Sequence, residues 1–141
     1  MPCVTRLKVE VANVTAPPER RPRVVLVDDH QSVLMAFRRL LQSSCDVVGC
    51  VANGQEALTA VRTLKPDVIV VDLMMPDMDG LEVCRRVKQE SPETHVVIVT
   101  AFDDEHVHGV ALQVGAAAFV PKHSGDALEE AIRRVFSEKP A

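Results

Sequence analysis

The stretch Val68-Ile69-Val70-Val71-Asp72 is a run of four β-branched residues that ends in a carboxylate. A short run of this kind, separated from the next by a segment of helix length, is typical of a strand buried in a parallel sheet. Three other runs have the same form and also lead to a polar residue. They are residues 24–27 before Asp28 and Asp29, residues 96–99 before Thr100, and residues 116–120, which reach Lys122 through Pro121.

These polar residues are predicted to meet at one edge of the sheet, because the carboxyl ends of parallel strands form the ligand-binding edge. The edge then carries three carboxylates, one hydroxyl and one ammonium group, which is what a site that transfers and holds a phosphoryl group requires. Three neighbouring carboxylates repel one another, so either their pKa values rise or a cation lies among them. An acidic all-oxygen site open to water suits Mg²⁺. The edge has no soft ligand, which argues against zinc or copper.

Helical segments are expected between the strands. After the first strand, apolar residues recur at helical spacing: Val33, Leu34, Phe37, Leu40 and Leu41. Asp46–Val51 predicts a second strand. The expected helix limits that follow are Asn53 and Pro66 for the second helix, Gly80 and Glu90 for the third, Asp103 or Asp104 and Gly115 for the fourth, and Ser124 and Ser137 for the fifth.

Five successive β-α units predict a doubly wound α/β fold, with a parallel five-stranded sheet and helices on both faces. Periodicity alone does not give the order of the strands. The acids at residues 28, 29 and 72 reach one point best if the first and third strands are neighbours. The flavodoxin-like order 2-1-3-4-5 makes that position the switch point of the sheet, where a crevice opens.

Composition limits the remaining possibilities. A chain of 141 residues with 47% hydrophobic content suits one domain, and 3% aromatic content implies a core of Val, Leu, Ala and Ile. The net charge of -4 argues against nucleic-acid binding by this chain itself. The four cysteines have no C-x-x-C spacing and are expected to be free thiols. With no apolar run of membrane length and no signal-peptide pattern, we expect a soluble cytoplasmic protein without a membrane partner.

The two ends of the chain differ from the rest. Residues 1–22 close with a cluster rich in proline and charge, and we expect a flexible extension there. A short added strand around Val9 and Val11 is the alternative, because these residues alternate with charged ones. The folded domain is expected over residues 23–138, and residues 139–141 begin a linker or tail.

Four blocks of the chain resemble the signature blocks of a bacterial response-regulator receiver domain. They are residues 27–29 (Val-Asp-Asp), 71–80 (Val-Asp-Leu-Met-Met-Pro-Asp-Met-Asp-Gly), 99–101 (Val-Thr-Ala) and 119–122 (Phe-Val-Pro-Lys). Their order and spacing are specific, and the likeness covers residues 23–138. The Asp-Asp-His start and the Lys122-His123-Ser124 ending are most similar to receivers of the NarL/FixJ type. In that type a LuxR-type helix-turn-helix domain usually follows, which this chain lacks.

The resemblance implies a role for each acid. Asp72 is the phosphoacceptor, attacking the phosphorus of a phosphohistidine on a sensor histidine kinase or phosphotransfer protein. Asp29 binds Mg²⁺ directly and Asp28 mostly through water. Asp72 itself and the backbone carbonyl of Met74 supply further oxygens to the metal.

The resemblance also implies how a phosphoryl group is held and sensed. Lys122 pairs with the phosphoryl oxygens, and the hydroxyl of Thr100 donates a hydrogen bond to one of them. Thr100 and Phe119, the latter at the family's switch-aromatic position, then move together and change the packing of the fourth helix, fifth strand and fifth helix. Such a domain is no enzyme in the ordinary sense, since it catalyses only its own phosphorylation and dephosphorylation. A homodimer through the receiver is a further expectation.

The expected output is control of transcription through a DNA-binding domain that is absent from this chain. The alternatives are a stand-alone receiver that acts by protein-protein interaction and a phosphorylation-independent pseudo-receiver, which would be expected to lose one of the five polar residues. A haloacid-dehalogenase-type phosphatase would need Asp-x-Asp-x-Thr, which residues 28–32 lack. A flavodoxin-like redox protein would need a phosphate-cradling loop and aromatic residues against the flavin, and neither is found.

Overall fold

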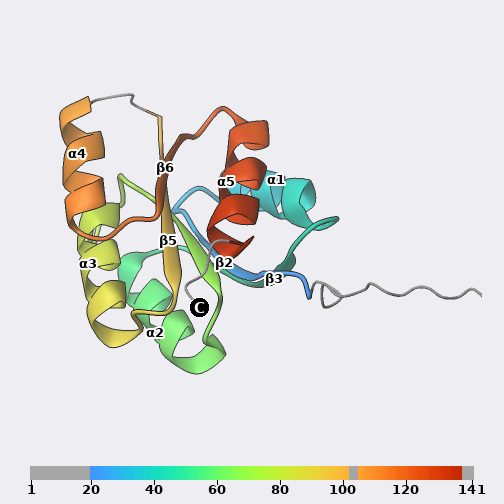
Figure 1. Cartoon of the computed structure of the whole chain (residues 1–141), viewed down its shortest axis with the longest axis horizontal. Helices are drawn as coiled ribbons and strands as arrows, with labels where there is room; N and C mark the ends of the chain where they lie inside the picture. The colour runs from blue at the N-terminus through green and yellow to red at the C-terminus, as the bar shows by residue number, and fades with distance from the viewer. Residues whose placement is uncertain (1–19, 102–104, 138–141) are drawn as a thin grey trace, which may run out of the picture.

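The computed structural model describes residues 20–101 and 105–137, in which strands and helices alternate (Figure 1). The strands are β2 (Arg23–Val27), β3 (Asp46–Val51), β4 (Val68–Asp72), β5 (His95–Thr100) and β6 (Ala118–Pro121). The helices are α1 (Gln31–Leu41), α2 (Gly54–Leu64), α3 (Gly80–Glu90), α4 (Glu105–Gln113) and α5 (Gly125–Ser137). None of the helices in the described ranges is long and apolar enough to cross a membrane.

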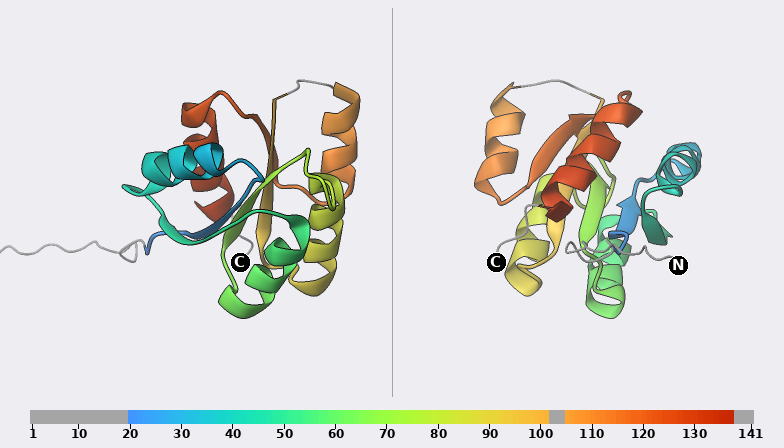
Figure 2. Two further views of the ribbon diagram at one scale, coloured as in Figure 1. Left: turned by 180° about the vertical axis from the view of Figure 1, so that it is seen from behind. Right: turned by 45° about the vertical axis from the view of Figure 1, so that its right-hand side comes forward.

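The five strands form one parallel sheet in the order β3-β2-β4-β5-β6. This is the predicted order 2-1-3-4-5, which is confirmed. Helices α2, α3 and α4 cover one face of the sheet, and α1 and α5 cover the other, so the molecule has three layers (Figures 1 and 2). After β2 the chain forms the edge strand β3 on one side of β2, and then β4 on the other side of β2. The boundary between β2 and β4 is therefore the switch point of the sheet.

The sheet divides the hydrophobic core into two halves, because successive residues of a strand point to opposite faces. Val25 and Val27 of β2 belong to the half under α2, α3 and α4, whereas Val24 and Leu26 belong to the half under α1 and α5. Strands buried on both faces need apolar residues at every position. This requirement explains the unbroken valine-rich runs of the sequence.

The last strand starts later than the sequence suggested. The apolar run was expected to begin at residue 116, but β6 begins at Ala118, because the preceding residues close α4. The N–H of Gly115 donates to the carbonyl of Leu112 over 3.1 Å, and the N–H of Ala116 donates to Ala111 over 3.0 Å. Gly115 has φ +103°, so the helix ends in a Schellman motif that favours glycine.

Two helices begin at a side-chain cap, of which the cap at Asn53 was predicted. The side chain of Asn53 accepts from the N–H of Glu56 over 2.9 Å at the start of α2. Asp79 accepts from Glu82 over 2.9 Å at the start of α3, which runs over the predicted residues 80–90. Each cap satisfies one of the N–H groups that a helix start leaves without an intrahelical partner.

Several expectations fall outside the described residues. These are the N-terminal extension before Arg20, with its alternative strand at Val9 and Val11, and the helix start at Asp103 or Asp104. The end of the domain at residue 138 and the linker after it fall there as well, so the division of the chain into an extension, a domain and a tail stays a prediction. Within the described part, Cys45, Cys50 and Cys84 are free thiols, as expected.

Candidate functional site

The carboxyl ends of β2, β4 and β6 bring the predicted polar residues together. Val27 and Val71 are paired across β2 and β4, so Asp28 and Asp72, one residue further along each strand, lie next to each other. Both residues are buried, with exposures of 1% and 3%. Lys122 follows β6 directly, and its backbone N–H donates to the carbonyl of Thr100 over 2.7 Å. The lysine therefore enters the site beside the end of β5.

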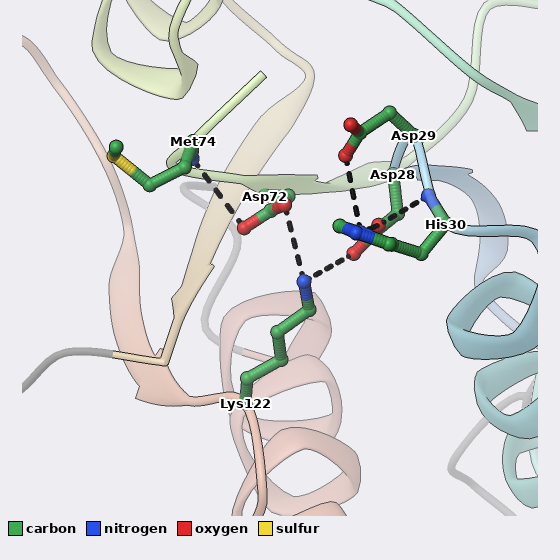
Figure 3. A network of polar contacts seen from close by, with 6 residues as sticks. All are labelled: Asp28, Asp29, His30, Asp72, Met74 and Lys122. Atoms are coloured by element: carbon green, nitrogen blue, oxygen red, sulfur yellow. Dashed lines mark hydrogen bonds and ion pairs between the residues drawn. The ribbon is translucent and has the colours of Figure 1, made fainter. Parts of the chain in front are cut away.

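The ammonium group of Lys122 lies between the two buried carboxylates (Figure 3). Its Nζ donates to Oδ2 of Asp72 over 3.1 Å and lies 2.8 Å from Oδ2 of Asp28. Burial raises the pKa of Asp72, and the neighbouring charge of Asp28 raises it further, against the attraction of Lys122. Burial lowers the pKa of Lys122, but its two carboxylate partners outweigh that effect and leave it raised. One cation thus compensates two buried acids only in part.

Asp29 and His30 complete the cluster on its solvent side. Nδ1 of His30 lies 3.2 Å from Oδ1 of Asp28 and 3.2 Å from Oδ1 of Asp29, and its backbone N–H donates to Oδ1 of Asp28 over 2.8 Å. The ring is therefore held between the two acids (Figure 3). The sequence did not indicate these contacts of His30, because nothing in a hydrophobic pattern shows that its ring turns back onto both carboxylates.

The donor set fits a hard divalent cation. Asp28, Asp29, His30 and Asp72 offer ligand atoms that all lie within 4.8 Å of one another. Oδ2 of Asp28 is buried and has no hydrogen-bond partner among the described residues, although Lys122 lies nearby as an ion-pair partner. A buried carboxylate is costly unless a cation compensates it, and Lys122 supplies a single positive charge for two buried acids. Three carboxylates around one point, with partial exposure at Asp29, match the preference of Mg²⁺ for few protein ligands and several waters.

The loop after β4 is held close to the acids. The N–H of Met74 points to Oδ1 of Asp72 at 3.4 Å, while the Met74 side chain is exposed and points away from the carboxylates (Figure 3). A Cβ on Gly80 would lie 2.8 Å from the backbone oxygen of Asp72, so the start of α3 can approach the site only with glycine at this position.

One residue of this loop has a role that the sequence did not indicate. The carboxylate of Asp77 accepts from the N–H of Gly54 over 3.0 Å and from that of Gln55 over 3.2 Å, at the start of α2. The hydrogen bond from Gly54 is the main reason why the pKa of Asp77 is lowered. Asp77 thus ties the loop beside the acids to the neighbouring helix.

Thr100 and Phe119 are the two residues for which the resemblance implies a switch, and this role stays a prediction. Thr100 ends β5 and is buried, and Phe119 lies inside β6 and is only partly buried. Phe119 was expected in a buried run, but β6 is an edge strand of the sheet, so one side of its residues lacks a strand neighbour.

The fold, together with the carboxylates and the lysine at the carboxyl edge of its parallel sheet, defines a class of protein. Residues 24–133 match the family described as "Response regulator receiver domain", and the chain belongs to that family. Response regulator GacA of Pseudomonas viridiflava is 39% identical over 118 residues, covering 82% of this chain and 55% of the relative. The signal receiver domain of NarL from Mycobacterium tuberculosis superposes with a TM-score of 0.81 at 32% identity, covering 85% of this chain and 99% of that one.

A second solved structure, a DNA-binding response regulator of the LuxR family from Staphylococcus aureus, superposes with a TM-score of 0.76 at 25% identity and covers 82% of this chain and 98% of that one. Together these likenesses identify a receiver of the NarL/FixJ type, as the sequence blocks indicated. The chain spans about half the length of the curated relatives it matches.

Proposed function

We propose that Asp72 accepts a phosphoryl group from a histidine residue of a sensor kinase or phosphotransfer protein, and that the chain relays this modification as a change of conformation. The observation that carries the proposal is the contact of Lys122 with the buried carboxylates of Asp72 and Asp28 at the end of the sheet. An isolated structural ion pair of Lys122 and Asp72 would need neither a second buried acid, Asp28, nor a third, partly exposed carboxylate, Asp29, at the same point. A phosphoryl site needs both.

In this reaction one carboxylate oxygen of Asp72 attacks the phosphorus of the phosphohistidine. The new O–P bond forms while the P–N bond breaks, and the electron pair of that bond returns to the imidazole nitrogen of the donor. Lys122, already 3.1 Å from Oδ2 of Asp72, pairs with the phosphoryl oxygens, and Thr100 donates its hydroxyl to one of them. Positioning and charge compensation of this kind are most of what phosphoryl transfer asks of a protein.

Asp28, Asp29, Asp72 and the backbone carbonyl of Met74 are proposed to hold Mg²⁺. The ion supplies positive charge next to the oxygens on which negative charge accumulates during transfer. The cluster of carboxylates within 4.8 Å of one another supports this choice of metal. The protein catalyses its own modification and its reversal, and no reaction on another substrate is proposed.

The test is transfer from a small phosphodonor such as acetyl phosphate, followed by intact-protein mass spectrometry with and without Mg²⁺. Wild-type protein should gain one phosphoryl group only with Mg²⁺, and Asp72→Asn should gain none. Asp79→Asn is the matched control, because asparagine can still cap α3 at that position. Mg²⁺-dependent phosphorylation of Asp72→Asn would place the acceptor elsewhere.

The conformational change is proposed to run through Thr100 and Phe119. When the Thr100 hydroxyl moves toward the phosphoryl group, space opens behind it, and the Phe119 ring turns inward to fill that space. The face formed by α4, β6 and α5 then changes its packing. Thr100→Ala should still accept a phosphoryl group, although more slowly, and should lose the change of NMR chemical shifts over α4 and β6.

The output is proposed to be transcription control in the cytoplasm, through a DNA-binding domain encoded beyond residue 141 and with a receiver homodimer as the active form. Support comes from the curated relatives, of whose length this chain matches only 55% and 57%, and from the LuxR-family neighbour. Reading the DNA that follows the codon of Ala141 tests this proposal. A continuing frame with a helix-turn-helix pattern supports it, whereas a stop codon would favour a stand-alone receiver that acts on protein partners.

A further inference from the structure

The rings of His108 in α4 and Phe119 in β6 are stacked on each other. Their centroids lie 4.9 Å apart, and their planes differ by 13°. His108 is an exposed residue of α4, whereas Phe119 is a partly buried residue of β6. The imidazole therefore covers a ring that would otherwise face solvent at this edge strand.

The stack lies on the same side of the sheet as Thr100. Phe119 packs against the half of the core under α2, α3 and α4, while its neighbour Val120 belongs to the other half. Ile98 pairs with Phe119 across β5 and β6 and belongs to the same half. Thr100 comes two residues after Ile98, so the alternation of strand residues places it on that face too. A Phe119 ring that turns toward Thr100 would move along this face and away from His108.

We propose that His108 is a positioning residue that holds Phe119 against α4 and thereby opposes the switch at the phosphoacceptor site; this inference rests on the proposed function. The stack exists in only one of the two positions of Phe119. An interaction present in one state alone shifts the equilibrium by its full value. His108 thus raises the free energy that the phosphoryl group must supply before the packing of the α4–β6 face changes.

The expected size of the effect follows from the usual strength of aromatic stacking, which corresponds to about a two- to tenfold change in an equilibrium. Coupling between two sites is reciprocal. If loss of the His108 ring favours the inward position of Phe119 by that factor, the site at Asp72 should bind a phosphoryl mimic more tightly by up to the same factor.

The experiment is a titration of Mg²⁺-loaded protein with beryllofluoride, followed by NMR. His108→Ala should bind the mimic about two- to tenfold more tightly than wild type, and its mimic-free spectrum should shift toward the bound one at α4 and β6. His108→Phe keeps a stacked ring and should retain wild-type affinity. Gln113→Ala, an exposed position at the end of α4, is the control for general effects on the helix.

A double-mutant cycle separates this role from a merely structural one. On a Phe119→Leu background, His108→Ala should leave the affinity for beryllofluoride unchanged. Equal affinities of wild type and His108→Ala, with wild type binding the mimic normally, would overturn the inference and leave the proposed function intact. Wild-type protein that binds no beryllofluoride would overturn the proposed function, and the inference with it.

Discussion

Lys122 is the residue on which the electrostatic balance of the site depends, because its ammonium group contacts both buried acids. Lys122→Met should lower the free energy of unfolding at pH 7 by on the order of 2 kcal/mol. This is less than the full cost of breaking a deeply buried pair, since the Lys122 side chain is 17% exposed and the carboxylates can take up protons. Chemical denaturation measures the loss, and Lys122→Arg, which keeps the charge, should lose much less.

The same variant gives a pH test with a definite sign. The pKa of Asp72 is raised in the folded protein. Its protonation therefore stabilises the folded state at a pH below the ordinary pKa of aspartate, and this stabilisation is lost as pH rises through the raised pKa. Removing Lys122 raises that pKa further, because the attraction of the lysine lowers it. The stability difference between Lys122→Met and wild type should therefore narrow as pH falls from 7 to 5. A difference that stays constant over this range would contradict the charge argument.

A substitution at Asp29 should distinguish a role in metal binding from a role in folding. Mg²⁺ should raise the melting temperature of wild-type protein, and chelation should reverse the effect. Asp29→Ala should abolish most of this increase without lowering the melting temperature of the metal-free protein, because it relieves repulsion among the carboxylates. Asp46→Ala, an exposed aspartate at the start of β3, should keep the full response to Mg²⁺. Loss of metal-free stability with an unchanged Mg²⁺ response would indicate a structural role for Asp29.

The sequence predicted the acids and Lys122 of the site because strand ends in a parallel sheet must meet at one edge. It did not predict that His30 lies between Asp28 and Asp29, or that Asp77 caps α2. Both contacts depend on the path of a loop backbone, and hydrophobic periodicity carries no information about that path. The stack of His108 on Phe119 was missed for a related reason, since it needs the angle at which α4 lies on the sheet.

At the scale of elements, helices and strands were predictable where apolar spacing was regular. Helix α4 is the weakest case. Among the described residues of that helix only Ala111 is fully buried, whereas Val107 and Val110 are only partly buried. The helix covers the sheet near an edge strand, where there is less surface to pack against, so residues of similar hydrophobicity differ in burial.

Substitution by alanine at two glycines near α4 should change the stability of the protein in opposite directions. Gly115→Ala should lower stability by about 1–2 kcal/mol, because φ is +103° and the new Cβ would lie 2.9 Å from Cγ of Lys88. Gly109 lies inside the helix, and a Cβ there would meet no atom within 4 Å. Gly109→Ala should therefore raise stability by about 0.5–1 kcal/mol. Thermal denaturation checks both, and equal signs would contradict the assignment of the C-cap.

At the scale of the whole molecule, Arg20 connects segments that are far apart in the sequence. Its guanidinium donates to both oxygens of Asp67, over 2.8 and 2.9 Å, and lies 5.2 Å from the ring centroid of Phe136 at the end of α5. The backbone N–H of Arg23 donates to Asp67 as well, over 2.8 Å. The entry of the chain into the sheet and the end of its last helix are thus joined through one carboxylate and one cation.

Arg20→Ala should lower stability by a few tenths to about 1 kcal/mol at pH 7, since more than half of the Arg20 side chain is exposed. Although burial of Asp67 opposes the effect, hydrogen bonds from Arg20 and Arg23 leave its pKa lowered. The stability that the Asp67 interactions contribute is therefore present above the ordinary pKa of aspartate, and it is lost as pH falls through the lowered pKa of Asp67. The difference in stability between Arg20→Ala and wild type should shrink below about pH 4. A difference that grows with acidification would contradict the ion pair of Arg20 with Asp67.

The position of β2 in the sheet has a consequence for the order of folding events. This first described strand lies between β3 and β4, and all four pairings in the sheet are parallel. Every pairing therefore has to wait until a whole helix has closed the loop between its partners, and no tight hairpin can form first. Chain closure over such distances must precede any gain from pairing. During synthesis, β2 leaves the ribosome with both of its edges unpaired. One edge has to wait until β3 has emerged as far as Val51, and the other until β4 has emerged as far as Asp72.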